Sequence, residues 1–199
     1  MRIREKRILF WLQLTSWVTV IGLIFIMTPI SNAEETQSNK GSQEVQEMTP
    51  AVHKSMDFHY EIASPNSSWK ILPKPNDILN RPASDVELYS EDKASYFLVI
   101  AEKAGLNLTT LKEISLATAK SGSTNFTLVT DQPVKVNGIE GSMLSYTLEN
   151  SNMKFRYTAG YFVNKGFTYQ LVGYTFASQY NADIEKDFKD IINSFKIIG

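Results

Sequence analysis

The second half of the chain alternates apolar and polar residues with a period of two. Apolar residues occupy every second position from Met153 to Val163, and the same alternation runs over Leu144–Leu148 and Phe167–Leu171. Such alternation is typical of strands that bury one face. Asn137-Gly138 and Asn164-Lys165-Gly166 separate the segments, and both favour tight hairpin turns. The pattern therefore predicts an antiparallel meander with one buried face.

Shorter strand candidates precede the meander. Phe126–Thr130 and Val134–Val136 lead into the Asn137-Gly138 turn. Further upstream, Phe58–Ala63, Asp85–Ser90 and Ser95–Glu102 also have strand character. The last of these holds a dense apolar run, which predicts a central strand.

Two segments have the pattern of an α-helix. Thr110-x-x-Glu113 resembles a capping box that opens a helix to about Lys120, with a stop near Gly122. The second helix closes the chain. Its apolar residues fall on a single stripe, namely Tyr180, Ile184, Phe188, Ile191, Ile192 and Phe195. A closing helix packed on the meander makes a layered α+β sandwich.

The chain begins with the features of an export signal. Met1–Arg7 is basic, Ile8–Met27 is an uncharged and mostly apolar run, and Ser31-Asn32-Ala33 precedes Glu34. This order predicts a signal peptide cleaved between Ala33 and Glu34. The apolar run, at 20 residues, is also just long enough to cross the hydrocarbon core, so an uncleaved anchor is the alternative. Under either interpretation the domain is exported, into the periplasm or to the outside.

Composition changes sharply after this leader of residues 1–33. Residues 34–57 are dominated by Glu, Gln, Ser, Asn, Lys and Thr, without an apolar period. A segment of this kind cannot bury enough surface to offset its ordering entropy. We therefore expect a disordered spacer over 34–57 and one folded domain over 58–199.

Charge and cysteine content narrow the class of protein. The leader has four basic residues and one acidic residue, which leaves 16 basic and 20 acidic residues in the rest of the chain. A mildly acidic exported chain lacks the basic surface that nucleic-acid binding requires. The 199 residues include no cysteine, which excludes thiol catalysis, zinc–thiolate sites and lipoprotein acylation.

The sequence offers little for a catalytic site. Histidine is the usual base in nucleophilic catalysis. Of the two histidines, His53 falls in the predicted spacer and His59 is best interpreted as an ordinary strand residue. Ser67-x-x-Lys70 and Ser151-x-x-Lys154 match one motif of the penicillin-recognising enzymes, but no S-D-N or K-T-G motif accompanies them. We expect no catalytic residue, no metal site and no cofactor.

Two groups of charged residues could serve a ligand. The first group consists of four carboxylates, namely Asp85, Glu87, Glu91 and Asp92. A pair among them could cleave a glycoside, but a solvated strand edge is the simpler interpretation. The second group, Lys154 and Arg156, shares one face of a predicted strand. It could hold an acidic partner, although exposed charges also protect strand edges from aggregation, and we favour that interpretation.

The order of elements resembles the PsbP-like family. The resemblance covers Phe58 to Ile198 and rests on motifs at the start, in the meander and at the end of the domain. These motifs are Tyr60-x-Ile62 with Pro65 and Trp69, the Asn137-Gly138 turn, Gly166-Phe167-x-Tyr169-x-Leu171-x-x-Tyr174, and Phe188-x-x-Ile191-x-x-Ser194-Phe195. The resemblance implies a Mog/PsbP-like α/β/α sandwich, with a meander sheet covered by helices.

The same resemblance implies binding rather than chemistry, because family members with a known role dock on larger assemblies such as photosystem II or a small GTPase. We therefore expect a non-catalytic extracytoplasmic accessory protein that docks on a larger, membrane-associated assembly through an unidentified protein partner. The alternative is a carrier of a lipid or small apolar ligand, held between the sheet and a covering helix. A hydrolase ranks third.

Overall fold

A computed structural model describes residues 50–72 and 83–199 of the chain. The predicted leader, its cleavage site between Ala33 and Glu34, and the spacer up to residue 49 lie outside the described residues. None of the helices in the described part is long and apolar enough to cross a membrane.

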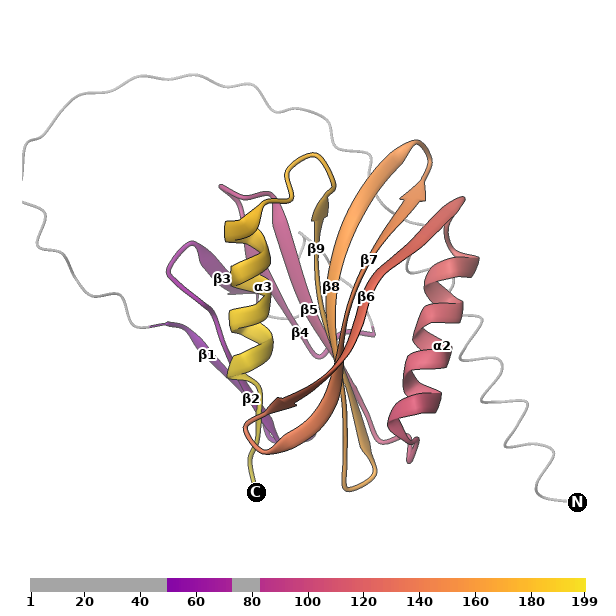
Figure 1. The fold of residues 1–199 in the computed structure, drawn as a ribbon. Coiled ribbons are helices and arrows are strands. Elements are labelled where there is room, and N and C mark those ends of the chain that lie inside the picture. The colour runs from indigo at the N-terminus through magenta and orange to yellow at the C-terminus, as the bar shows by residue number, and fades with distance from the viewer. Residues whose placement is uncertain (1–49, 73–82) are drawn as a thin grey trace, which may run out of the picture.

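A seven-stranded sheet forms the centre of the domain (Figure 1). Its strand order is β3-β4-β5-β9-β8-β7-β6, and every neighbouring pair is antiparallel. In chain order the strands are β3 (Trp69–Leu72), β4 (Val86–Ser90), β5 (Ser95–Glu102), β6 (Asn125–Val136), β7 (Ile139–Asn150), β8 (Met153–Asn164) and β9 (Phe167–Phe176). The predicted meander is confirmed by β6 to β9.

Helices cover both faces of this sheet, α2 (Leu108–Ser121) on one side and α3 (Ala182–Ser194) on the other (Figure 1). Beside α3 lies a second, three-stranded sheet of order β1-β2-β10. Its strands are β1 (Val52–Ser55), β2 (Tyr60–Ala63) and β10 (Lys196–Ile197). The predicted α+β sandwich is therefore confirmed.

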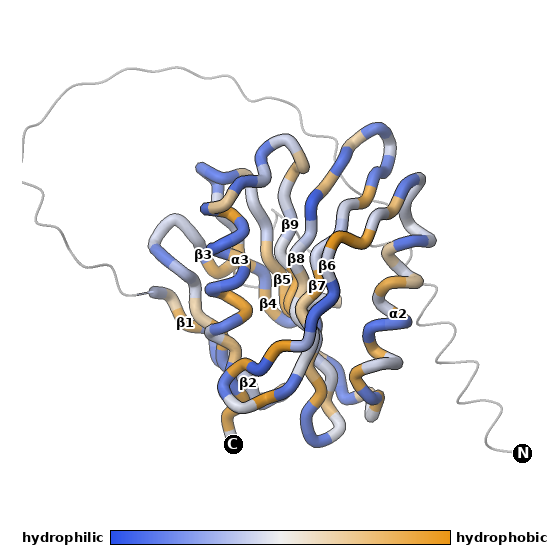
Figure 2. The backbone as a smooth tube through the Cα atoms, in the orientation of Figure 1, coloured by the Kyte–Doolittle hydropathy of each residue, from blue (hydrophilic) through white to orange (hydrophobic). Residues whose placement is uncertain are grey.

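The expectation that only one face of the meander is buried is wrong. Along β8, Phe155 and Tyr161 pack into the core beneath α2, while Phe162 packs into the core beneath α3. Apolar residues accordingly gather in the middle of the sheet, whereas the β7–β8 and β8–β9 turns are hydrophilic (Figure 2). Thr158, a polar residue on the same face of β8 as Phe162, is buried as well.

Order begins before the predicted boundary at Phe58. Strand β1 lies inside the segment 34–57 that the sequence predicts to be a spacer, and it pairs in register with β2, Val52 opposite Ala63 and Ser55 opposite Tyr60. The strand has no apolar period because only one of its four residues is buried and the backbone ladder with β2 holds it. Residues 50–57 therefore belong to the domain.

The predicted Asn137-Gly138 turn is confirmed, but the predicted N-terminal cap of the first helix is not. Asn137 and Gly138 have φ values of 47° and 86°, as a type I′ hairpin requires. The two segments that precede this turn form one strand, β6, with a bulge between Leu128 and Thr130. The capping box at Thr110 is wrong, because the N-cap is Asn107, whose side chain accepts a hydrogen bond from the Thr110 amide.

Candidate functional site

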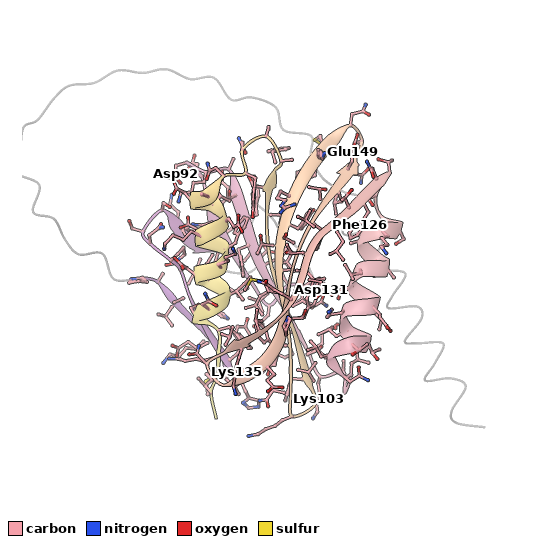
Figure 3. The ribbon with its side chains drawn as sticks, viewed as in Figure 1. Asp92, Lys103, Phe126, Asp131, Lys135 and Glu149 are labelled. Carbon is pink, nitrogen blue, oxygen red and sulfur yellow. The ribbon has the colours of Figure 1, made fainter. Side chains whose placement is uncertain are left out.

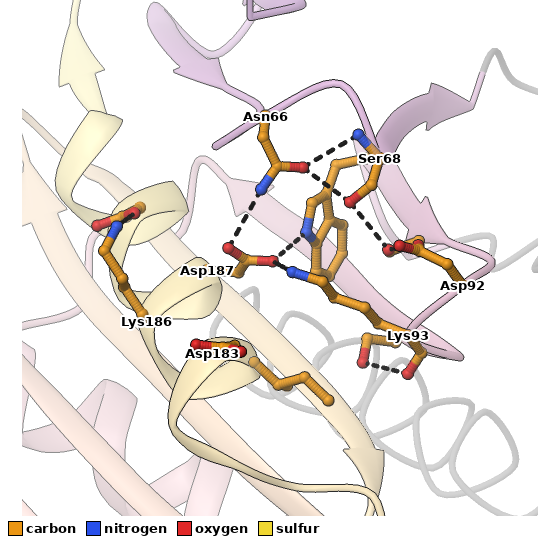
Figure 4. A network of polar contacts seen from close by, with 12 residues as sticks. Asn66, Ser68, Asp92, Lys93, Asp183, Lys186 and Asp187 are labelled. Atoms are coloured by element: carbon orange, nitrogen blue, oxygen red, sulfur yellow. Dashed lines mark hydrogen bonds and ion pairs between the residues drawn. The ribbon is translucent and has the colours of Figure 1, made fainter.

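Asp187 lies on the buried face of α3 and binds three side chains from distant segments (Figure 4). Trp69 Nε1 donates to its Oδ2 over 2.8 Å, and Lys93 Nζ contacts the same oxygen at 2.5 Å. Asn66 Nδ2 donates to Oδ1 over 3.3 Å. The carboxylate is thus engaged at both oxygens by the protein's own donors, so this cluster anchors α3 to the loops around β3 and β4.

A second cluster is centred on Asp85, where β4 begins. Tyr60 OH donates to Asp85 Oδ2 over 2.6 Å, and His53 Nε2 lies 3.7 Å from the same oxygen. Burial alone would raise the pKa of Asp85, but His53, Tyr60 and Ser55 outweigh it and hold that pKa below its ordinary value. Burial, and then Asp85, raise the pKa of Tyr60, so this phenol is a hydrogen-bond donor and a poor nucleophile.

A third cluster joins α2 to the sheet through Asp131 on β6 (Figure 3). Lys112 Nζ contacts both carboxylate oxygens at 2.7 Å, and Ser142 Oγ donates to Oδ1 over 2.8 Å. Burial acts to raise the pKa of Asp131, yet Lys112 and Ser142 lower it overall. The ionised carboxylate of Asp131 is therefore bound by Lys112 and Ser142 and holds α2 against the sheet.

Arg156 on β8 differs from these groups. Its Nη2 donates to Ser145 Oγ over 3.1 Å, and its guanidinium lies over the ring of Tyr180, 5.1 Å from the centroid. Its Nε is buried and has no hydrogen-bond partner. The favoured interpretation of Lys154 and Arg156 as guards of a strand edge is wrong, because β8 lies inside the sheet, between β7 and β9.

The four carboxylates that could have formed a catalytic pair have separate partners. Glu87 accepts a hydrogen bond from Ser84, and Asp92 accepts one from Ser90. Glu91 lies 3.9 Å from Lys70, and Asp85 belongs to the Tyr60 cluster. No group of three or more potential metal ligands occurs among residues 50–72 and 83–199.

The second Ser-x-x-Lys motif and the two histidines lie in turns or strands, where their contacts are those of ordinary structural residues. Ser151 lies in the β7–β8 turn with φ of 50° and donates to Asn150. His59 is a turn residue with φ of 55°, not a strand residue, and its ring packs against Phe167 at 5.5 Å. His53 lies on β1 rather than in a spacer.

No family model matches the sequence, and no curated protein matches it. Solved structures do match the fold. Cyanobacterial PsbP (CyanoP) from Synechocystis sp. PCC 6803 superposes with a TM-score of 0.56 and 16% identity, over 79% of this chain and 98% of CyanoP. The fold is PsbP-like.

Two further structures share the PsbP-like fold. LpqN, involved in cell envelope biogenesis of Mycobacterium tuberculosis, matches with a TM-score of 0.54 and 12% identity, over 76% of this chain and 90% of LpqN. A protein from Bacteroides thetaiotaomicron matches with a TM-score of 0.52 and 10% identity, over 76% of this chain and 50% of that protein. These superpositions establish the PsbP-like fold. Sequence identities this low do not carry a function over to this chain, so function must be argued from its own residues.

Proposed function

We propose that this protein is a non-catalytic, extracytoplasmic accessory module that docks on a larger, membrane-associated protein assembly. One observation carries the proposal: the carboxylates of Asp85, Asp131 and Asp187 are each bound by the fold's own donors. A general acid, base or nucleophile must be open to a substrate, and these groups serve instead to join helices and strands.

The PsbP-like fold and the leader support the same proposal. CyanoP has this architecture throughout its length, and LpqN, with the same architecture, is involved in cell envelope biogenesis. The basic and apolar residues of Met1–Met27 favour export, whether or not the chain is cleaved after Ala33.

Affinity capture tests this function directly. The full-length protein, tagged at its C-terminus and expressed in its own cells, should recover a defined set of membrane-associated proteins after chemical crosslinking. Gly173→Trp provides the misfolded control, because any side chain at Gly173 on β9 would clash with the ring of Phe188 on α3. If no protein is enriched over this control, and a broad hydrolase screen finds turnover that Ser→Ala changes abolish, the proposal is wrong.

A second function, carriage of a lipid or small apolar ligand, has one observation in its favour. Over 14 residues α2 buries only Leu111 and Ala119, whereas α3 buries five residues over 13. Beneath α2 the sheet presents an aromatic face that includes Tyr146, Tyr157 and Phe155. A weakly packed helix over an apolar face could move to admit a ligand. Native mass spectrometry of the protein purified from its own cells tests this, since a carrier retains a co-purifying lipid.

A further inference from the structure

Arg156 places a positive charge at a half-buried position on the α3 side of the sheet. It lies on β8 next to Thr158, on the opposite side from Phe155 and Tyr157, which pack beneath α2. Register pairs it with Thr147 on β7 and Thr175 on β9. It is the sole arginine within the described ranges 50–72 and 83–199. The surrounding positions are mostly hydroxyl-bearing residues.

The guanidinium is held in place, but no carboxylate of the described residues forms a direct ion pair with it. Ser145 accepts one hydrogen bond, and the Tyr180 ring supports the flat face of the group. The nearby carboxylate of Glu185 forms its ion pair with Lys189, whose Nζ contacts it at 2.6 Å, and the charge of Arg156 acts on it from a greater distance. Within the described part of the chain, Arg156 forms no ion pair, although guanidinium groups at buried positions normally have one.

Hydroxyl groups complete the surroundings. Thr130 Oγ1 and Ser145 Oγ are 2.9 Å apart, and Tyr180 OH lies 3.4 Å from Thr158 Oγ1. The hydroxyls of Thr130 and Ser145 can donate to an oxyanion as well as accept, whereas Tyr180 OH donates toward Glu185 and supports the site through its ring. Arg156 therefore stands in a cluster of donors, the Arg156 site, which consists of Thr130, Ser145, Arg156 and Tyr180.

We propose that the Arg156 site receives the carboxylate of a glutamate or aspartate from a partner protein. The inference rests on the proposed docking function and names the chemistry of its contact. A single carboxylate matches the local charge, because three cations, Lys154, Arg156 and Lys189, face two carboxylates. These are Glu149, opposite Lys154 in register, and Glu185, which is paired with Lys189, so one net positive charge remains. A phosphate dianion would require a second cation. Arginine binds a carboxylate through two parallel N–H groups, which gives the contact a defined orientation.

A titration with a defined probe tests the site without the natural partner. The probe is a short peptide with an acetylated N-terminus and an amidated C-terminus that contains one glutamate. The control peptide is identical except that glutamine replaces this glutamate. The full-length protein, labelled with ¹⁵N and held in detergent micelles, reports through the Nε–H resonance of Arg156, assigned by its loss in Arg156→Lys. The glutamate peptide should shift this resonance saturably, and the glutamine peptide should not.

Variants give the second measurement. Arg156→Lys keeps the charge but loses the two-pronged geometry, so it should weaken binding of the glutamate peptide at least tenfold. Lys154→Gln, a neighbouring exposed cation on the same strand, should weaken binding less than twofold. Equal shifts with both peptides, or tighter binding of inorganic phosphate than of the glutamate peptide, overturn the inference. If Arg156→Lys does not fold, through-bond experiments on the wild type assign the Nε–H resonance of Arg156, and the wild-type titration still decides.

Affinity capture separates this inference from the proposed function. If Arg156→Gln recovers the same membrane proteins as the wild type, docking stands and the Arg156 site is not its contact. If the glutamate peptide binds and no protein is recovered by the wild type, the site stands and the docking function fails.

Discussion

Gly173 on β9 lies so close to Phe188 on α3 that a Cβ atom at Gly173 would stand 2.5 Å from the aromatic ring. Phe188 is fully buried and also contacts the rings of Trp69 and Phe97, so it has no free space to move into. The absence of a side chain at Gly173 therefore sets how closely α3 approaches the sheet.

Gly173→Ala should lower the free energy of unfolding by about 2 kcal/mol. The core is close-packed, so the added methyl group must displace either α3 or the ring of Phe188. Urea unfolding measures the change. Gly160→Ala, whose new methyl would stand 2.9 Å from Ile192 Cγ2 and 3.0 Å from the Phe162 ring, should cost less because these contacts are longer than those at Gly173. The double variant with Phe188→Leu should recover part of the loss, since the two positions are in contact. Simple additivity of the two changes would contradict this account.

Asp187→Ala should be more damaging than any exposed acidic substitution on α3. The change leaves Lys93 without its ion pair and Trp69 Nε1 without its acceptor, at a cost of about 3 kcal/mol. Urea unfolding gives the stability, and a shift of tryptophan emission reports the altered surroundings of Trp69. Asp183→Ala, one turn earlier and exposed, is the matched control and should cost less than about 1 kcal/mol. Equal losses would show that the Asp187 cluster is not an anchor.

The sequence predicts the elements of this fold where local pattern decides them. Alternation from Met153 to Val163 and the Asn137-Gly138 turn depend on neighbours in the chain, and both predictions are confirmed. Strand β1 was missed because its order comes from pairing with β2, which no local pattern records. The resemblance to the PsbP-like family is confirmed as a likeness of fold.

The polar clusters could not be predicted, because their members lie far apart in the sequence. Asp187 is separated from Trp69 by 118 residues and from Lys93 by 94. One signal was present: Asp187 lies between apolar residues of the α3 stripe, at a position where an exposed acid is not expected. Arg156 was noticed with Lys154, but its interior position became evident only from the strand order, which places β8 between β7 and β9.

The start of α2 offers a test of cap assignment. Asn107 Oδ1 accepts a hydrogen bond from the Thr110 amide over 2.9 Å, so Asn107→Ala should cost about 1 kcal/mol in the free energy of unfolding. Thr110→Ala changes a residue inside the first turn and should cost less than half as much. Urea unfolding of the two variants distinguishes them. If Thr110→Ala lowers the free energy of unfolding more than Asn107→Ala does, Thr110 is the N-cap, as the capping box predicted from the sequence requires.

Asp85 gives the domain a pH-dependent term in its stability. The folded pKa of Asp85 lies below its ordinary value, so its contribution is present above about pH 4 and is lost as the pH falls through the folded pKa. Asp85→Asn should therefore be less stable than the wild type at pH 7, and the difference should shrink at pH 3. Unfolding curves at both pH values measure this. Asp57→Asn, at an exposed turn position, is the control. A difference that stays constant with pH would refute the assignment.

Processing of the leader decides whether the protein is released or tethered. The basic start, the polar residues Gln13, Thr15, Ser16 and Thr19 within the apolar run, and the helix-breaking Pro29 all favour cleavage after Ala33. Signal peptidase requires a small residue at this position, so Ala33→Tyr should block processing and leave a larger, membrane-bound form. Thr36→Tyr, beyond the site, should be processed normally. N-terminal sequencing of the exported wild type should begin at Glu34-Glu35. If it begins near Met1, and the protein stays with membranes after a carbonate wash, the leader is an anchor and any partner must lie within reach of the membrane surface.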